Sequence, residues 1–464
     1  MSGAQTILTQ QGPTNVSMPA SEVYAIATEY VDAGRLDAAD RLLGHILGSA
    51  PRQAEALHLR GLIAFRRGRL QEAGELMEQA MRFGAVKALH LRNMSEVYRQ
   101  LARLDEAALA ASRAVAMDPT DALAPFNLAM VEYDRLQMDK SIAASRMALA
   151  RKADLPEAHM KLGQALLVTG DLATGWEHYE WRYKIPGAAP LMPATDRKQW
   201  DGSPMPEDRL LLIGDQGYGD VIMFGRYVRW AQERCAKITL ACSPEMRGLA
   251  EQIAPGAEIV TRWDDCPPYA AFCPLSGLPR LAGIRVPDLP GLTNYVTADP
   301  AKVALWKARL DDALPAGGRR IAIAWSGRPT HNNDRNRSIT LSQLAPLAAV
   351  PGVSFVSIQK GPAAAQCEGW TGEAPLLNLD ATIESFEDSA AILSNVDLLV
   401  SVDTSMVHLA GSLGRPAWVM LPYAPDWRWL LDRDDSPWYP SVRLFRQPRP
   451  RDWNSVIANV IAAL

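Results

Sequence analysis

The stretch DLLVSVDTSMVHLAGSLGRP, residues 397–416, is the most informative segment of this 464-residue chain. An apolar run at 398–402 predicts a buried strand, the polar triplet DTS predicts a turn, and helical spacing then continues to Gly414. In a strand–turn–helix unit of this kind, backbone N–H groups and the positive end of the helix point beyond the sheet. Such an arrangement suits a diphosphate.

The same residues also have a structural interpretation. Asp403 and Thr404 could serve only as a helix cap, and His408 could be a packed histidine. Every α/β protein contains several such units, so this segment alone favours the structural interpretation. The rest of the chain has to decide between an anion site and ordinary packing.

Composition indicates a globular protein without a basic surface for nucleic acid, because the hydrophobic content is 48%, the charged content 22% and the formal net charge −4. The five cysteines form no CxxC pair, so neither a zinc site nor a disulfide framework is predicted. The polar residues 1–20 lack the pattern of a secretory signal and are expected to be disordered. No apolar run approaches the ~18 residues of a membrane span, so a cytoplasmic protein without a transmembrane segment is predicted.

A 34-residue repeat occupies the first part of the chain. Small residues recur in two series, Ala27, Gly61, Ser95, Ala129 and Gly163, and Ala39, Ala73, Ala107, Ser141 and Gly175. Each unit is predicted to hold two amphipathic helices that approach closely at these small side chains. Because one unit cannot bury its apolar face alone, several units must stack.

This pattern resembles the tetratricopeptide repeat over residues 21–182. The small–aromatic pair Ser95/Tyr98 carries the resemblance, although Leu57 and Leu91 replace the tryptophan that is common early in that motif. The resemblance implies an α-solenoid whose concave face binds a protein partner. The alternative is that the repeats form a scaffold or a dimerisation arm, in which case the protein could be a homo-oligomer.

Short apolar runs alternate with helical segments in the second part, at 210–213, 238–241, 321–325, 353–358, 396–402 and 417–421. Such alternation predicts parallel α/β sheets, whose ligands bind beyond the carboxyl ends of the strands. The expected fold class is therefore α + α/β. Its expected segments are a disordered start (1–20), about five helix pairs (21–185), a Pro-rich linker (186–207) and two α/β domains (208–314 and 315–464).

A glycine-rich loop follows the first of these strands, in LLIGDQGYGDVIMFGRYV at 211–228. Gly217 and Gly219 permit close backbone approach to a ligand, but the spacing matches neither a P-loop nor the dinucleotide fingerprint. Asp220 opens the next helix. It could act as a general base toward a hydroxyl nucleophile, or it could only cap its helix, and the local sequence does not separate the two.

A basic loop, AWSGRPTHNNDRNRSITL at 324–341, follows a second predicted strand. Arg335 and Arg337 could neutralise a diphosphate leaving group there, whereas the alternative is a solvated surface loop. The segment after the strand at 417–421 is rich in aromatic and charged residues and is expected to wall the site. Its DRD triplet at 432–434 does not directly follow a strand, so no metal site is predicted from it.

Together these segments resemble the heptosyltransferase-like glycosyltransferases of family 9 over residues 210–464. The residues that carry the resemblance are Gly219, Asp220 and Val221, then Trp325, Ser326, Gly327, Arg337 and Ser338, and finally Asp403, Thr404, Ser405 and His408. The resemblance implies two facing Rossmann-like domains (the GT-B fold), with the acceptor domain first and the donor domain second. It implies inverting, metal-independent sugar transfer from a nucleotide-sugar substrate, with no cofactor. Repeats fused to such a pair are also similar to the O-linked N-acetylglucosamine transferases that modify proteins.

The resemblance assigns a role to each matched residue. Asp220 matches the catalytic base, with Gly217 and Gly219 in its loop, and Arg337 stands where the family often has a lysine facing the diphosphate. The donor-binding residues that follow are Ser326, Gly327, Arg335, Arg337, Gln359, Asp403, Thr404, Ser405, Met406 and His408. Arg335 competes with Arg337 for the diphosphate, and Ser405 replaces a residue that is often glycine.

A second hypothesis comes from another class of protein. The repeats could make the chain an adaptor whose α/β part is a degenerate, non-catalytic module. Under the transferase hypothesis the sugar, the nucleotide base and the acceptor stay open. A protein docked by the repeats, a lipid-linked glycan and a lipopolysaccharide precursor all agree with the sequence.

Overall fold

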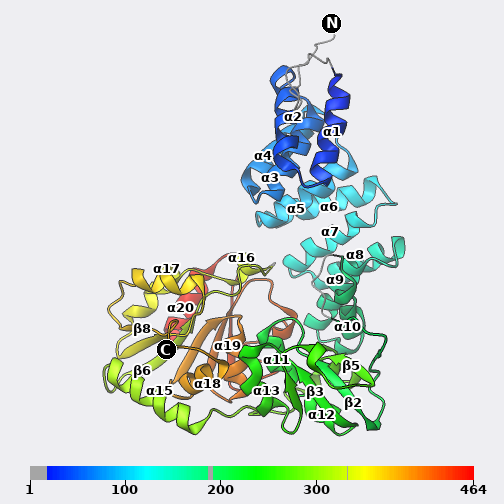
Figure 1. The fold of residues 1–464 in the computed structure, drawn as a ribbon. Coiled ribbons are helices and arrows are strands. Elements are labelled where there is room, and N and C mark those ends of the chain that lie inside the picture. Colours follow the sequence, from blue (N-terminus) through cyan, green and yellow to red (C-terminus); the bar gives the residue numbers. More distant parts are fainter. Residues whose placement is uncertain (1–17, 187–191, 332) are drawn as a thin grey trace, which may run out of the picture. The chain divides into compact units, whose positions relative to one another are not determined.

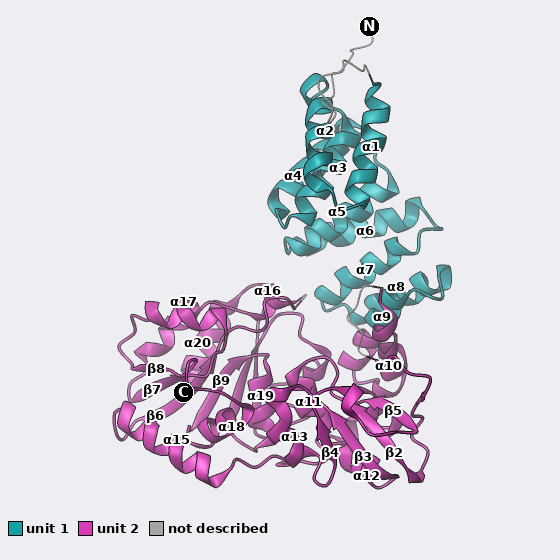
Figure 2. Cartoon of the chain, in the orientation of Figure 1, with its two compact units in different colours: residues 1–161 teal, residues 162–464 magenta. Residues whose placement is uncertain are grey.

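The computed structural model describes residues 18–186, 192–331 and 333–464, and the chain forms two compact units, Met1–Lys161 and Leu162–Leu464 (Figure 2). Residues 1–17 of the predicted disordered start lie outside the described residues. Residues 187–191 of the predicted linker lie outside them as well.

The first unit consists of helices packed in consecutive pairs (Figure 1). They are α1 (Ala20–Asp32), α2 (Leu36–Ser49), α3 (Ala54–Arg66), α4 (Leu70–Phe83), α5 (Ala88–Gln100), α6 (Leu104–Met117), α7 (Leu123–Asp134) and α8 (Met138–Arg151), and α9 (Pro156–Val168) crosses the unit boundary. This arrangement confirms the predicted helical repeat.

Small side chains lie where the helices of a pair meet. A Cβ atom on Gly61 of α3 would lie 2.7 Å from Cγ of Met77 and 3.2 Å from the carbonyl oxygen of Ala73, both on α4. Ala27 and Ala39 occupy the matching positions of the first pair and are fully buried. The 34-residue spacing of small residues therefore marks contacts between helices, as predicted.

The boundary between the units falls inside the predicted fifth helix pair. The sequence placed the end of the repeats at residue 185, but α10 (Leu172–Tyr179) belongs to the second unit. Trp176 of α10 explains this placement, because its ring meets Phe224 edge-on at 6.1 Å and Trp427 edge-on at 5.0 Å. The large aromatic side chain is 1% exposed and joins α10 to the α/β core.

The first sheet of the second unit is fully parallel. Its strand order is β1 (Lys198–Gln199), β5 (Ala271–Pro274), β2 (Met205–Ile213), β3 (Cys235–Ala241) and β4 (Glu258–Val260). The helices between these strands are α11 (Tyr218–Gly225), α12 (Val228–Gln232), α13 (Arg247–Ile253) and, after β5, α14 (Leu278–Leu281). The predicted linker therefore contributes strand β1 and the start of β2 to this sheet.

The second sheet is also fully parallel. Its strand order is β11 (Val442–Arg446), β10 (Ala417–Leu421), β9 (Leu398–Val402), β6 (Arg319–Ala324), β7 (Val353–Ser357) and β8 (Leu376–Asn378). Its helices are α16 (Asp334–Arg337), α17 (Leu341–Leu344), α18 (Phe386–Ser394), α19 (Ser405–Ser412) and α20 (Trp453–Ala463). The chain starts at the central strand β6, builds outward to β8, and then returns to build from β9 to β11. The switch point of this sheet therefore lies between β6 and β9, and doubly wound sheets in general bind their ligands at such a position.

Helix α15 (Pro300–Ala313) packs on the second sheet's helix layer, although the sequence placed it in the first α/β domain. The Nζ atom of Lys302 lies 2.9 Å from Oδ1 of Asp388 on α18, and Nε1 of Trp306 donates a hydrogen bond of 3.3 Å to the same oxygen. These contacts place the change from one sheet to the other before residue 300, rather than at 314.

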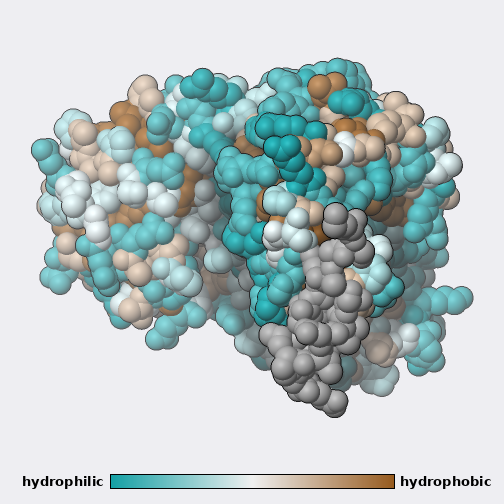
Figure 3. Space-filling view, turned by 90° about the horizontal axis from the view of Figure 1, so that it is seen from above, coloured by the Kyte–Doolittle hydropathy of each residue, from teal (hydrophilic) through white to brown (hydrophobic). Residues whose placement is uncertain are grey.

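The surface agrees with a globular protein. The face seen in Figure 3 is largely hydrophilic, and its apolar residues occur in scattered groups. Within the described residues, no helix combines the length and the apolar character needed to cross a bilayer.

Candidate functional site

The switch point of the second sheet gathers most of the predicted donor-binding residues. Strands β6 and β9 are hydrogen-bonded neighbours, with Ala324 opposite Ser401. Ser326 and Gly327 follow the end of β6, while Asp403 and Thr404 follow the end of β9. The two polar turns therefore lie side by side at the carboxyl edge of the sheet.

Arg337 connects these two turns. Its Nη1 atom donates a hydrogen bond of 3.3 Å to the carbonyl oxygen of Asp403. A Cβ atom on Gly327 would lie 2.5 Å from Nη2 of Arg337, so the guanidinium lies directly against this turn and would have to shift if a side chain were added there. Arg337 is 17% exposed, and its Nε atom forms an ion pair of 3.5 Å with Oδ1 of Asp334 on the same short helix. Arg335 lies on the same short helix α16 but is exposed, so Arg337 is the arginine that reaches the strand ends.

Gln359 supports the turn after β6. Its Oε1 atom accepts hydrogen bonds from the N–H groups of Trp325 and Ser326, at 3.0 and 2.9 Å. Its Nε2 atom donates to the carbonyl oxygens of Ser326 and Lys360, both at 3.0 Å. The Gln359 side chain is 5% exposed, and its hydrogen bonds stabilise the backbone of the turn after β6. Its contact with a nucleotide-sugar donor stays a prediction.

Helix α19 begins at the turn after β9. In the described structure the Thr404 side chain accepts no hydrogen bond from the first turn of this helix, and its Oγ1 atom lies 3.1 Å from Oγ of Ser401. Ser405 and Met406 open the helix and are partly exposed. Thr404 is therefore not the side-chain cap that the structural interpretation expected, and the start of α19 keeps its positive end.

His408 is a buried, neutral ring. Burial, together with the positive charges of Arg428 and Arg226, lowers the pKa of His408 to about 3. Its Nδ1 atom lies 3.1 Å from the Tyr439 hydroxyl, and its ring stacks on Trp429 at 5.6 Å. Any contact of this imidazole with an anion would therefore be made by a neutral group.

The first turns of α11 and α19 touch each other. A Cβ atom on Gly219 would lie 2.7 Å from Cδ2 of His408 and 3.4 Å from Cα of Ser405. Glycine at this position lets the loop after β2 lie against the turn after β9. The contact brings Asp220, the next residue, to the edge of the second sheet's switch point.

The Asp220 carboxylate has two partners. Its Oδ2 atom accepts a hydrogen bond of 3.0 Å from the N–H of Gly217, and its Oδ1 atom accepts from Nη2 of Arg428. Burial raises the pKa of Asp220 above its ordinary value, while the charge of Arg428 opposes this rise. Asp220 therefore caps its helix, as one interpretation held. It also stays 18% exposed, and an ionised carboxylate offers about four lone-pair positions, so further hydrogen bonds are available.

Arg428 is a site residue that the sequence did not indicate individually. It lies in the short 3₁₀ helix η8 (Trp427–Trp429) that follows β10, is 9% exposed, and also bonds Oδ1 of Asp426 at 2.8 Å. Burial disfavours its charge, but Asp220 and Asp426 raise the pKa of Arg428 above its ordinary value. The signal that could have indicated Arg428 was its position in the segment after β10, which the sequence analysis had already predicted to wall the site.

The pKa values of Asp403 and Asp426 are shifted in opposite directions. Burial and the negative charge of Asp426 raise the pKa of Asp403 to about 6, against the opposing charge of Arg337. Burial also acts to raise the pKa of Asp426, but Arg428 outweighs it and lowers that pKa below the ordinary value. Asp426 is therefore ionised at neutral pH, and Asp403 takes up a proton in mildly acidic solution.

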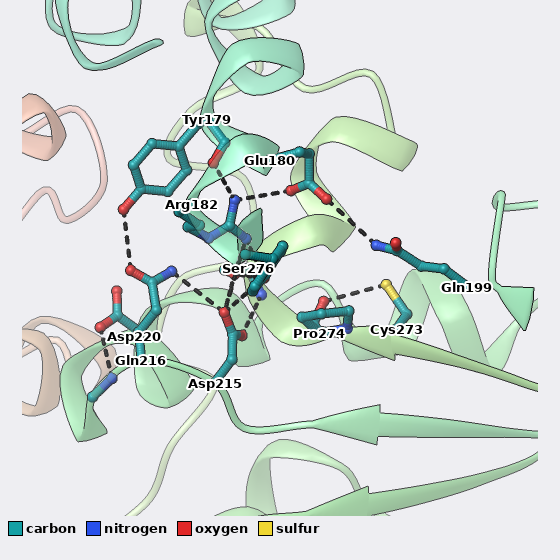
Figure 4. Close-up of polar contacts among 12 residues, drawn as sticks. Tyr179, Glu180, Arg182, Gln199, Asp215, Gln216, Asp220, Cys273, Pro274 and Ser276 are labelled. Carbon is teal, nitrogen blue, oxygen red and sulfur yellow. Dashed lines mark hydrogen bonds and ion pairs between the residues drawn. The ribbon is translucent and has the colours of Figure 1, made fainter. Parts of the chain in front are cut away.

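The switch point of the first sheet, between β2 and β5, is filled by a buried polar network (Figure 4). Asp215, which follows β2, accepts hydrogen bonds from the N–H of Ser276 at 3.1 Å and from the Tyr183 hydroxyl at 2.9 Å. The Nη2 atom of Arg182 lies 3.8 Å from Oδ2 of Asp215 and donates a hydrogen bond of 2.6 Å to Oγ of Ser276. Arg182 and Tyr183 come from the 3₁₀ helix η1 (Glu180–Lys184), so this network attaches the segment after α10 to the first sheet.

One cavity, of about 450 Å³, includes none of the predicted donor-binding residues. It is lined by Val168, Thr169, Leu430, Leu431, Asp432, Arg433 and Asp435. Over the part of the chain that the structure describes, no group of three or more His, Cys, Asp and Glu side chains is arranged to hold a metal ion.

Comparison with protein families supports the repeat. Residues 24–85 match the family model described as tetratricopeptide repeat. Among curated proteins, the chain is 28% identical over 378 residues to Protein FlbA of Caulobacter vibrioides (strain ATCC 19089 / CIP 103742 / CB 15). That match covers 73% of this chain and 60% of FlbA, so the chain spans less than two thirds of that relative's length.

Similar solved structures match about a third of the chain. MamA from Desulfovibrio magneticus RS-1 is 20% identical, with a TM-score of 0.33, and covers 36% of this chain and 97% of its own. YrrB, titled a TPR protein with an unusual peptide-binding site, is 17% identical, with a TM-score of 0.32 and coverages of 36% and 87%. PilF of Pseudomonas aeruginosa is 16% identical, with a TM-score of 0.34 and coverages of 37% and 78%.

Proposed function

We propose that this chain is an inverting, metal-independent glycosyltransferase that moves a sugar from a nucleotide-sugar donor to an acceptor. The observation that carries the proposal is the position of the polar turns after β6 and β9, at the switch point of a doubly wound parallel sheet. Under the proposal this sheet is a Rossmann-like donor domain, and the sheet of β1 to β5 is the facing acceptor domain of a GT-B fold.

The charges of this region suit a diphosphate. Arg337 lies 17% exposed against both turns, and α19 presents its positive end beside them. An arginine in this position offers several N–H donors to phosphate oxygens. We assign the donor diphosphate to Arg337 and to the start of α19, with Ser326, Gly327, Thr404 and Ser405 around it.

Asp220 acts in this proposal as the general base. It takes the proton of the acceptor hydroxyl while the hydroxyl oxygen forms a bond to the anomeric carbon on the face opposite the diphosphate. The bond between that carbon and the diphosphate oxygen breaks, and its electron pair leaves with the nucleoside diphosphate. Arg337 stabilises the charge that develops there, an effect typically worth several kcal/mol.

The repeats supply the acceptor side of the proposal. Tetratricopeptide arrays usually present a concave face to a protein partner, so an acceptor protein docked on the first unit is the favoured substrate class. The donor sugar and its nucleotide base are left to experiment.

Calorimetry of the full chain with UDP-, GDP-, ADP- and CMP-linked sugars tests the proposal. We expect binding of at least one diphosphate donor, and CMP-linked sugars provide a monophosphate comparison. Arg337→Ala should weaken that donor by roughly tenfold or more, because it removes a charged phosphate contact. Arg335→Ala is the matched control, since Arg335 lies on the same helix but is exposed, and it should change the affinity much less.

The geometry around Asp220 also supports a second candidate. Both carboxylate oxygens already have protein partners, Gly217 and Arg428, as a purely structural aspartate would. In that case the chain is an adaptor whose repeats bind a protein and whose α/β part is not catalytic. Silence across the whole donor panel, with a partner protein still captured by the repeats, would favour the adaptor.

A further inference from the structure

Helix α10 lies beside both loops that hold Asp220. It carries two buried aromatic side chains, Trp176 and Tyr179, which are 1% and 4% exposed. By its 34-residue phase it is the last helix of the repeat series, yet it belongs to the same compact unit as the candidate site. Its contacts reach the loop after β2 and the loop after β10.

The first contact runs through Gln216 (Figure 4). The Tyr179 hydroxyl donates a hydrogen bond of 3.0 Å to Oε1 of Gln216, whose Nε2 atom lies 3.4 Å from Oδ2 of Asp215. Gln216 has φ +67°, a left-handed conformation that is unfavourable for a non-glycine residue and persists only where the surrounding structure holds it. The next residue, Gly217, gives its N–H to Asp220. The Tyr179 hydrogen bond therefore supports the backbone conformation that places this N–H.

The second contact runs through Trp427. The rings of Trp176 and Tyr179 meet the Trp427 ring edge-on, at 5.0 and 5.8 Å. The guanidinium of Arg428 lies over the same ring, 4.3 Å from its centre. Aromatic packing from α10 therefore fixes the segment from which Arg428 reaches Asp220.

We propose that α10 is a positioning element of the candidate site, in which Tyr179 acts through Gln216 and Trp176 acts through Trp427 to hold the Asp220 carboxylate between Gly217 and Arg428. The catalytic consequence of this arrangement rests on the proposed sugar transfer. Neither aromatic residue touches the reacting atoms. Both are positioning residues for the base.

Loss of the Tyr179 hydroxyl has a defined electrostatic result. Gln216 can then relax from its left-handed conformation and carry the Gly217 N–H away from Asp220. A hydrogen bond to the charged form of a carboxyl lowers its pKa, so losing this bond raises the pKa of Asp220. The other charges that face Asp220 come from Arg428, Asp215 and Asp426, and the substitution leaves all three in place.

Tyr179→Phe in the full-length protein tests the first contact. The protein is labelled with ¹³C at the aspartate carboxyl carbons, and the Asp220 signal is assigned by its absence from Asp220→Asn. Titration of this signal needs no donor. We expect its midpoint to lie at a higher pH in Tyr179→Phe than in the unsubstituted protein, and Trp176→Phe gives an independent variant for the second contact.

A rescue separates positioning from a general loss of packing. Glycine adopts positive φ freely, so Gln216→Gly in the Tyr179→Phe background should return the Asp220 midpoint toward its original pH. Tyr98→Phe is the matched control, because the Tyr98 hydroxyl donates a hydrogen bond of the same 3.0 Å to Glu78 within the repeat helices. It should leave the midpoint unchanged.

The outcomes distinguish this inference from the proposed function. An unchanged midpoint in both Tyr179→Phe and Trp176→Phe overturns the positioning role, whether or not a donor binds. A shifted midpoint that glycine rescues supports it, even if every sugar nucleotide in the donor panel fails to bind and the proposed transfer falls.

Discussion

The two parallel sheets reach their switch points with similar polar loops but fill them differently. In the first sheet, Asp215 and Ser276 meet each other directly and are 2% and 0% exposed. In the second sheet, Arg337 stays 17% exposed and Thr404 leaves the start of α19 without a side-chain cap within the described structure. One switch point is closed by the protein's own groups, and the other leaves an arginine and a helix start partly exposed.

The two switch points differ in how many of their polar groups are already hydrogen-bonded. Buried polar groups are almost always hydrogen-bonded, so the network around Asp215 has little capacity left for a ligand. The turns after β6 and β9 instead combine partial exposure with a cation, Arg337. Asp220 stands between the two regions, since its loop belongs to the first sheet and Gly219 touches His408 and Ser405 of the second.

Asp220→Asn should have the largest effect, because it removes the proposed base and keeps the shape of the side chain. We expect the transfer rate to fall by about 10²–10⁴-fold, since the amide cannot take a proton. The affinity for the sugar nucleotide should hold, as the donor turns lie on the second sheet. Rates and calorimetric affinities are measured with a donor that the panel identifies.

Asp452→Asn is the matched control for this substitution. Asp452 also caps a helix, because its Oδ1 atom accepts a hydrogen bond of 3.2 Å from the N–H of Ser455 at the start of α20. Asparagine caps helices about as well as aspartate. We expect no change in rate for this control. A fully active Asp220→Asn would remove Asp220 from the mechanism and leave it as a cap.

Arg428→Met should have the next largest effect, on stability. It removes the buried cation that Asp220 and Asp426 share, and breaking a buried ion pair costs about 3–5 kcal/mol. Urea denaturation measures the free energy of unfolding. Arg433→Met is the control, because Arg433 and Asp435 form an ion pair of 2.7 Å with side chains 27% and 69% exposed, and it should cost less than about 1 kcal/mol.

The sign of the pH dependence follows from the carboxyl groups. Arg428 lowers the pKa of Asp426 in the folded protein, and this contribution to stability is present above the ordinary aspartate pKa and is lost as the pH falls. Without Arg428, the pKa values of Asp220 and Asp426 both rise, which destabilises the folded state when these groups must ionise. The deficit of Arg428→Met should therefore be largest at neutral pH and narrow in acid. A deficit independent of pH would contradict the ion-pair explanation.

Local patterns predicted most of the fold. The 34-residue spacing of small residues found the helix pairs, and the apolar runs found β2, β3, β6, β7, β9 and β10 but not β5 or β11. The short strands β1, β4 and β8 hold only two or three residues each, too few to show a periodic pattern. The spacing did not show that α10 joins the second compact unit, because Trp176 packs on Phe224 and Trp427, which lie far along the chain.

The sequence located the individual turns of the candidate site but not the contacts between them. The turns after β6 and β9 were located because polar residues directly follow the apolar runs in the sequence. Arg428 and Asp220 are 208 residues apart, and no local pattern connects them. Similarly, Tyr179 reaches Gln216 over 37 residues and from a segment assigned to the repeats. Such contacts depend on how the two sheets and α10 pack, which one sequence does not specify by spacing.

Gly219→Ala should have the smallest effect of the three substitutions and tests the contact between the two turns. The added Cβ would lie 2.7 Å from Cδ2 of His408, a ring that Trp429 and Tyr439 already hold in place. Overpacking of this kind costs about 1–3 kcal/mol, measured by urea denaturation. Gly369→Ala is the control, because a Cβ there meets no atom within 4 Å, so its stability should change little. Equal stabilities for the two variants would mean that α11 and α19 do not touch, and Asp220 would then lose its place beside the donor turns.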